Sequence, residues 1–126
     1  MRILKNLLWL DCGAAALVGA GVILFAGPLS GFEGLPRSLL IFTGVVNLVY
    51  GSYSCSLAVR ADRTEGLIKL LVLANLAWVP VCFGLAVAFS ESATPFGFMH
   101  LIGEGLFVGG LAALEWRNRE LLLTAA

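Results

Sequence analysis

Four apolar stretches dominate this chain of 126 residues, at residues 7–27, 39–59, 67–89 and 96–116. Each is about as long as the roughly 20 residues that an α-helix needs to cross the hydrocarbon core of a bilayer. Only 13% of the residues are charged, about half of what a soluble domain carries. Because lipid cannot hydrogen-bond the backbone, a spanning segment must satisfy its own polar groups, as a helix does. The sequence therefore predicts an all-α polytopic membrane protein, a single domain in which four transmembrane helices form an antiparallel bundle.

The placement of the basic residues predicts how these helices are oriented. Of the eight lysines and arginines, seven lie at the N-terminus, around the loop between the second and third stretches, or at the C-terminus, and only Arg37 lies elsewhere. Cytoplasmic loops carry an excess of Lys and Arg, so we expect both termini and the middle loop in the cytoplasm (N-in/C-in). The formal net charge is zero. Without a basic patch to neutralise phosphates, a nucleic-acid partner is not expected.

Small residues predict where helices approach one another. The second stretch carries a stripe at steps of three and four residues, made of Gly44, Asn47, Gly51, Ser54 and Ala58. The fourth stretch carries Gly105 and Gly109 as a Gly-x-x-x-Gly motif. Such faces allow close backbone approach and interhelical hydrogen bonds. We expect these two faces to dock other helices.

The connection between the first two stretches is expected to be the larger external loop. Residues 28–36 are rich in glycine, proline and serine, which favour turns. Glu33 is the only charged residue within residues 28–36 and is expected to lie in this loop.

Several short motifs are spread over most of the chain. They are the Leu-x-x-Asp of residues 8–11, Gly34-Leu-Pro36, Asn75-Leu-Ala-Trp78, and Thr94-Pro95 followed by Gly97. This pattern resembles a family of small uncharacterised four-transmembrane-helix bacterial membrane proteins. The resemblance implies a four-span bundle in the bacterial inner (cytoplasmic) membrane, and it implies no activity. Glu104 stands roughly where that family has a polar residue, often Gln.

Polar side chains inside the apolar stretches are the candidates for a functional site. Glu104 and His100 lie one helical turn apart and therefore on one face. A carboxylate in hydrocarbon costs about 2.5 kcal/mol or more, so Glu104 must face protein or water. If the polar residues face inward, their depths predict a ladder across the bundle: Asp11, Asn75, Asn47 with Tyr50, Glu104 and His100. Trp78, one turn from Asn75, is expected to pack into the bundle or to line a pocket.

Two interpretations of this polar set remain open. In the functional one, Glu104 is a proton-accepting or cation-binding carboxylate that works with His100 in a proton-coupled carrier or a redox relay. In the structural one, it is protonated or hydrogen-bonded to Asn47, Asn75 or a tyrosine and fixes the helix register. Interhelical hydrogen bonds contribute about 0.6 kcal/mol on average. That gain explains the two asparagines more easily than it explains a buried carboxylate.

Charged residues near the ends of the stretches are expected to serve at the membrane interface. Asp11 is expected there, paired with Lys69 or Lys5. Glu115 lies beside Arg117 and is expected to be an ordinary boundary charge.

No motif predicts a metal, a cofactor or catalysis. The three cysteines, Cys12, Cys55 and Cys82, fall inside apolar stretches without CxxC or Cys–His zinc spacing, and they are expected to be small apolar packing residues. Cys82 could share a level with His100 and Glu104 in a zinc or copper site, but no spacing is diagnostic. The chain has one histidine, whereas a b-type haem normally takes two. No Ser–His–Asp set, phosphate loop or His-Glu-x-x-His motif is present, so an enzyme is the least expected class.

The function classes that remain are those of an integral membrane protein without soluble domains. The first is an accessory, assembly or interaction subunit, with the bilayer and a homo-oligomer or larger membrane complex as partners. The alternative is a small proton-coupled carrier, or a lipid- or quinone-binding protein with Trp78, Tyr50 and His100 around a pocket. Only this alternative implies a small-molecule ligand.

Overall fold

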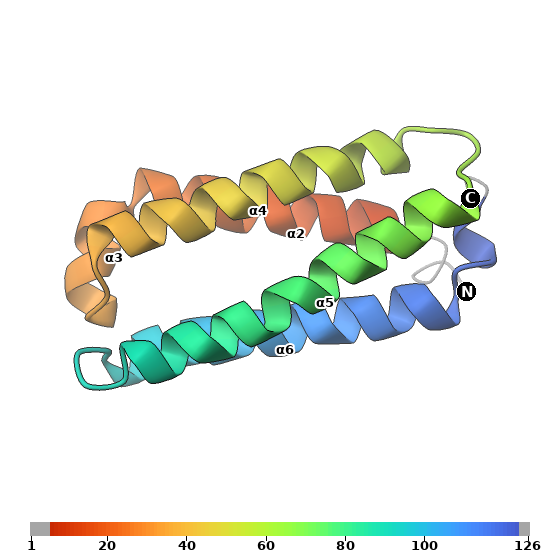
Figure 1. Cartoon of the computed structure of the whole chain (residues 1–126). Coiled ribbons are helices and arrows are strands. Elements are labelled where there is room, and N and C mark those ends of the chain that lie inside the picture. Colours follow the sequence, from red (N-terminus) through yellow and green to blue (C-terminus); the bar gives the residue numbers. More distant parts are fainter. Residues whose placement is uncertain (1–5, 124–126) are drawn as a thin grey trace.

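The computed structural model describes residues 6–123, and within them the chain is helical, without strands. The elements are α2 (Leu7–Leu24), α3 (Ala26–Glu33), α4 (Arg37–Ala58), α5 (Glu65–Ala88), α6 (Pro95–Arg117) and the 3₁₀ turn η1 (Leu121–Leu123) (Figure 1). Four of these helices, α2, α4, α5 and α6, are long and apolar enough to cross a membrane. The predicted all-helical architecture with four long apolar helices is thereby confirmed.

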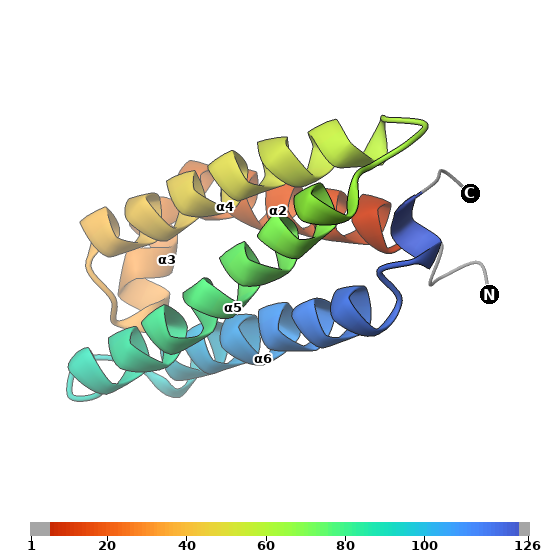
Figure 2. The same cartoon turned by 45° about the vertical axis from the view of Figure 1, so that its right-hand side comes forward.

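The long helices pack as two pairs, α2 with α4 and α5 with α6 (Figures 1 and 2). Glycines make both pairings close. A Cβ at Gly44 would meet Ile23 and the backbone of Gly19 on α2. A Cβ at Gly105 would lie 3.2 Å from both Cys82 and Phe83 on α5. The stripe on α4 and the Gly105 face on α6 therefore pack on helices of the same chain, as their small residues allow.

The segment predicted as an external loop is partly the helix α3, so that prediction was wrong over residues 28–33. Pro28 is the third residue of this helix, where its missing N–H costs nothing because the first-turn N–H groups have no intrahelical partner. Gly34 ends the helix in the left-handed conformation, with φ 68°. The N–H of Thr94 then donates to the Glu33 carbonyl at 2.9 Å, which holds α3 against the start of α6.

The opposite end of the molecule is closed by leucines and by one arginine. The buried Leu7, Leu57 and Leu122 belong to one hydrophobic cluster. The Arg63 guanidinium is buried and donates to the carbonyls of Leu57 (2.8 Å), Ala58 (3.0 Å) and Leu122 (3.2 Å). It therefore caps α4 and fixes η1 with one side chain.

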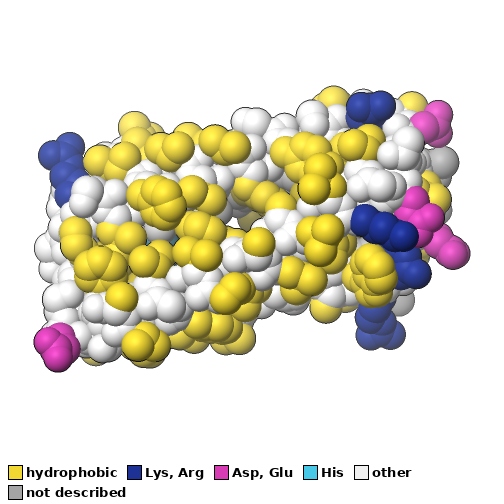
Figure 3. Space-filling model, in the orientation of Figure 1, with side chains coloured by type: hydrophobic (Ala, Val, Ile, Leu, Met, Phe, Trp, Pro, Cys, Tyr) yellow, Lys and Arg dark blue, Asp and Glu magenta, His cyan; other side chains and the backbone are white. Residues whose placement is uncertain are grey.

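Charged side chains on the visible face gather at the two ends of the molecule, and the middle of that face is hydrophobic (Figure 3). The start of α2 and the turn η1 lie at the same end (Figure 1), because an even number of long helices returns the chain to its starting side. This distribution is that of a protein with lipid around its middle.

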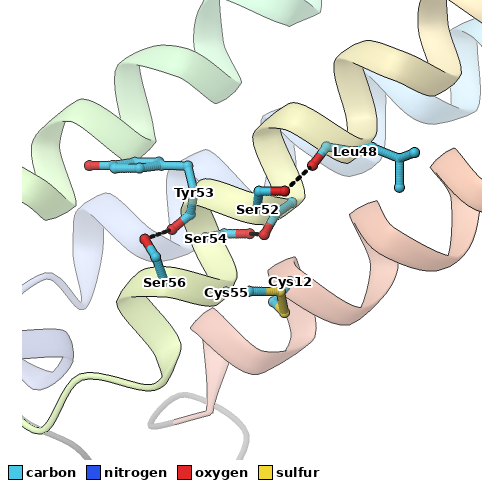
Figure 4. The surroundings of a disulfide bond; sticks show 8 residues. Cys12, Leu48, Ser52, Tyr53, Ser54, Cys55 and Ser56 are labelled. Atoms are coloured by element: carbon cyan, nitrogen blue, oxygen red, sulfur yellow. Dashed lines mark hydrogen bonds between the residues drawn. A yellow bond between two sulfur atoms is a disulfide. The ribbon is translucent and has the colours of Figure 1, made fainter.

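A disulfide joins Cys12 on α2 to Cys55 on α4 (Figure 4). Their Cα atoms are 4.8 Å apart, within the range for such a bond. The prediction that all three cysteines are apolar packing residues was wrong for these two. Cys82 is free and fully buried.

Candidate functional site

Glu104 is the centre of the first polar cluster, which lies between α4, α5 and α6. Its Oε1 accepts a hydrogen bond from Asn47 Nδ2 at 3.1 Å. Its Oε2 accepts from Trp78 Nε1 at 2.8 Å and from Cys82 Sγ at 3.4 Å. Three donors thus take the place of water around the carboxylate, as the cost of burying a charge requires.

His100 extends this cluster toward the end of the molecule where α3 lies. Its Nδ1 is 2.7 Å from Glu33 Oε1 and its Nε2 is 3.8 Å from Glu104 Oε1. A carboxylate can only accept, so Nδ1 donates to Glu33. The predicted contact of His100 with Glu104 is present, and Glu33, which was expected in the larger external loop, is buried at the end of α3. The result is a carboxylate–imidazole–carboxylate chain that runs inward from α3.

A second polar cluster lies toward the opposite end, where α2, α4, α5 and α6 meet. Asp11 Oδ2 accepts from Tyr50 OH at 2.8 Å and from Asn75 Nδ2 at 3.3 Å. The same Asn75 nitrogen donates to Glu115 Oε1 at 2.9 Å. Glu115, expected to be a boundary charge, is fully buried, because α6 turns this residue inward.

The predicted partner of Asp11 needs correction. Lys69 is not paired with Asp11, since its Nζ lies 3.3 Å from Glu65 Oε1 one turn earlier on α5. The other candidate, Lys5, lies outside the described residues. Tyr50 was expected beside Asn47, but its hydroxyl donates a hydrogen bond to Asp11. The single predicted ladder is therefore two clusters.

A pocket of about 980 Å³ lies between the two helix pairs and touches both clusters. Its wall includes every residue predicted for the site: Asp11, Asn47, Tyr50, Asn75, Trp78, His100 and Glu104. The rest of the wall is almost entirely apolar, with side chains such as Leu17, Val49, Ala77, Met99 and Phe107. Figure 3 shows a hollow near the middle of one face, between the α4 half and the α5 half.

Helix periodicity could have indicated that Glu115 faces inward and that Cys82, considered only as a packing residue or a metal ligand, lies beside the site. Glu115 follows Glu104 by eleven residues, or three helical turns, which places both on one face. Cys82 follows Trp78 by four residues on the same face of α5. Glu33 carried no such signal, because its position depends on the fold of α3.

Within residues 6–123, no group of three or more His, Cys, Asp or Glu side chains is arranged to hold a metal ion. Cys82, His100 and Glu104 come from two helices, and the contacts that the structure gives them are hydrogen bonds and the two imidazole–carboxylate contacts of His100. Comparison of the chain with protein-family models, with curated proteins and with solved structures finds no match.

Proposed function

We propose that this protein binds a lipophilic small molecule, lipid- or quinone-like, inside the bacterial inner membrane, with both of its termini in the cytoplasm. The observation that carries the proposal is the pocket between the helix pairs, with its apolar wall and its few polar groups. Its volume of about 980 Å³ is at the upper end of the range for small-molecule sites.

The exposed rim supports entry from the side. Leu17 on α2 and Met99 on α6 line the pocket and are also largely exposed. Val49 on α4 and Leu70 on α5 likewise line the pocket and are largely exposed, on the other side of the molecule. In a bilayer these exposed apolar side chains face acyl chains, so a lipophilic molecule reaches the pocket without crossing water.

The polar groups on the wall favour a ligand that also has a polar head. His100 keeps its Nε2 at 3.8 Å from Glu104, which leaves this nitrogen without a close direct hydrogen bond. A hydroxyl group of a ligand head would donate a hydrogen bond to it there. The apolar body would lie along α4 and α5 beside Val46 and Ala77.

The interaction-subunit hypothesis rested on two small-residue faces, and both are covered by helices of the same chain. Gly51 packs on Ala15, and Gly105 packs on Cys82 and Phe83. A docking role would need another surface, so the pocket supports ligand binding better than it supports assembly.

Gly103 offers a direct test because it lines the pocket and a Cβ there would meet nothing within 4 Å. Gly103→Leu therefore adds an apolar side chain at the pocket wall, and its Cβ atom meets no neighbouring atom. Gly110→Leu is the matched control, since a Cβ at Gly110 also meets nothing but Gly110 is not on the pocket wall.

The measurement is mass spectrometry of the small molecules that remain bound after purification in mild detergent. We expect a lipophilic molecule at near-equal occupancy in the wild type and in Gly110→Leu, and a loss of at least tenfold in Gly103→Leu. Equal occupancy in all three proteins, or no bound molecule in any, would overturn the proposal.

A further inference from the structure

We propose that Asp11 and Glu115 form a carboxyl pair that shares one exchangeable proton. The two side chains come from α2 and α6, and they converge on one amide. Asn75 Nδ2 lies 3.3 Å from Asp11 Oδ2 and 2.9 Å from Glu115 Oε1. These two oxygen atoms are therefore no more than about 6 Å apart, a distance at which like charges strongly disfavour double ionisation.

A proton would remove one of the two buried charges of the pair. Asn75 offers an N–H to each acid from the same nitrogen, whereas two ionised carboxylates have only acceptors to offer each other. Glu115 Oε2 is buried and no donor in the structure bonds to it. Solvent does not reach it either, because the residue is fully inaccessible. A proton on this oxygen would neutralise Glu115 and leave the pair with one negative charge instead of two.

The surrounding charges do not replace that proton. Tyr50 is the other titratable group in contact, and its hydroxyl donates to Asp11. Among the described cations, Arg63 binds backbone carbonyls and Lys69 pairs with Glu65. The structure shows no ion pair to either carboxyl group in this described part of the chain.

The geometry fits a proton better than it fits a sodium ion. A hard metal cation takes oxygen ligands. Here Asn75 turns its NH₂ group toward both acids, and Tyr50 turns its O–H toward Asp11. These are donors, which solvate a carboxylate and repel a metal ion.

Exchange of the proton has a route through the pocket. Asp11, Tyr50 and Asn75 line it, whereas Glu115 does not. The O–H bond on Glu115 breaks as an O–H bond forms on Asp11, and Asp11 then gives the proton to a water molecule that enters the pocket and becomes hydronium. The proton returns by the reverse path, and no electron is transferred.

Infrared spectroscopy of the protein in lipid nanodiscs at pH 7 tests the pair, because a protonated carboxyl group has its own C=O stretching band. We expect Glu115→Gln and Asp11→Asn each to remove the band intensity of one carboxyl group. Either change leaves a single acid that no longer needs to share a proton. Glu91→Gln, at an exposed position, should leave the band unchanged.

An unchanged band in both variants would show that the pair is fully ionised, and loss in only one would show that the proton is not shared. Either result overturns the proposal. The wild type gives a check that needs no substitution. As the pH is raised, its band should lose one carboxyl group in a single-proton step, and a band that never loses that intensity also refutes exchange.

Discussion

Asn47 provides the sharpest test of how the two helix pairs are held together. Its Nδ2 donates to Glu104 across the pocket at 3.1 Å and to the Thr43 carbonyl on its own helix at 2.9 Å. Asn47→Leu keeps the size of the side chain and removes the donor. The Thr43 carbonyl keeps its helical hydrogen bond, so the main loss is at Glu104.

The loss in the free energy of unfolding that Asn47→Leu causes depends on whether Glu104 is charged. An average interhelical hydrogen bond in a membrane contributes about 0.6 kcal/mol, whereas a bond to a charged group contributes about 1.5–3 kcal/mol. Trp78 and Cys82 still donate to Glu104 in the variant, which favours the lower part of that range. We therefore expect a loss of about 1.5–2 kcal/mol in the free energy of unfolding, or more than tenfold in the unfolding equilibrium constant.

The assay is equilibrium unfolding in mixed detergent micelles, with Asn47→Leu made in the wild type and in a Glu104→Leu background. In the Glu104→Leu background the Asn47 amide has no carboxylate to donate to. The loss in the free energy of unfolding caused by Asn47→Leu should therefore be smaller by at least 1 kcal/mol. Ser52→Ala on the exposed side of α4 is the control and should change stability by less than about 0.5 kcal/mol. An equal cost in both backgrounds would refute the reasoning.

Three further results follow from the structure. Gly97→Ala would drive a Cβ into the Glu33 carbonyl and should lower the midpoint of thermal unfolding by several degrees. The control Gly110→Ala has open space around the new Cβ and should leave the midpoint unchanged or raise it. Equal midpoints for the two variants would contradict the close contact at Gly97. Alkylation of the unfolded protein without reductant should label Cys82 alone, and labelling of three thiols would exclude the disulfide. Arg63→Lys cannot reach three carbonyls at once, so limited proteolysis should cut the C-terminal turn faster than in the wild type, and an unchanged rate would show that this arginine does not fix it.

The four long helices were predictable because the length and composition of an apolar stretch are set locally. A span of about 20 apolar residues has few alternatives in lipid. The helix α3 was not predictable in the same way. Gly27, Pro28, Gly31 and Gly34 read as turn residues, and tertiary contacts with α4 and with the start of α6 hold the segment as a helix.

The residues of the candidate site were predicted from the sequence better than their hydrogen-bond partners were. Depth along a helix places Asp11, Asn75 and Glu104 at different levels, but it does not give the rotation of each helix about its axis. That rotation decides that Tyr50 meets Asp11 and that Glu115 points inward. The disulfide likewise depends on the register of α2 against α4, which neither stretch encodes alone.

Ligand binding requires a pocket that stays open between the helix pairs in a bilayer. Nuclear Overhauser contacts, measured by NMR on protein in deuterated nanodiscs, test this most directly. Methyl groups of Val46 on α4 and Ala77 on α5, both on the pocket wall, should contact protons of a bound apolar molecule, and Gly103→Leu should abolish those contacts. Contacts from these methyl groups to protein alone, unchanged in Gly103→Leu, would show that the helix pairs close on each other and would contradict the account.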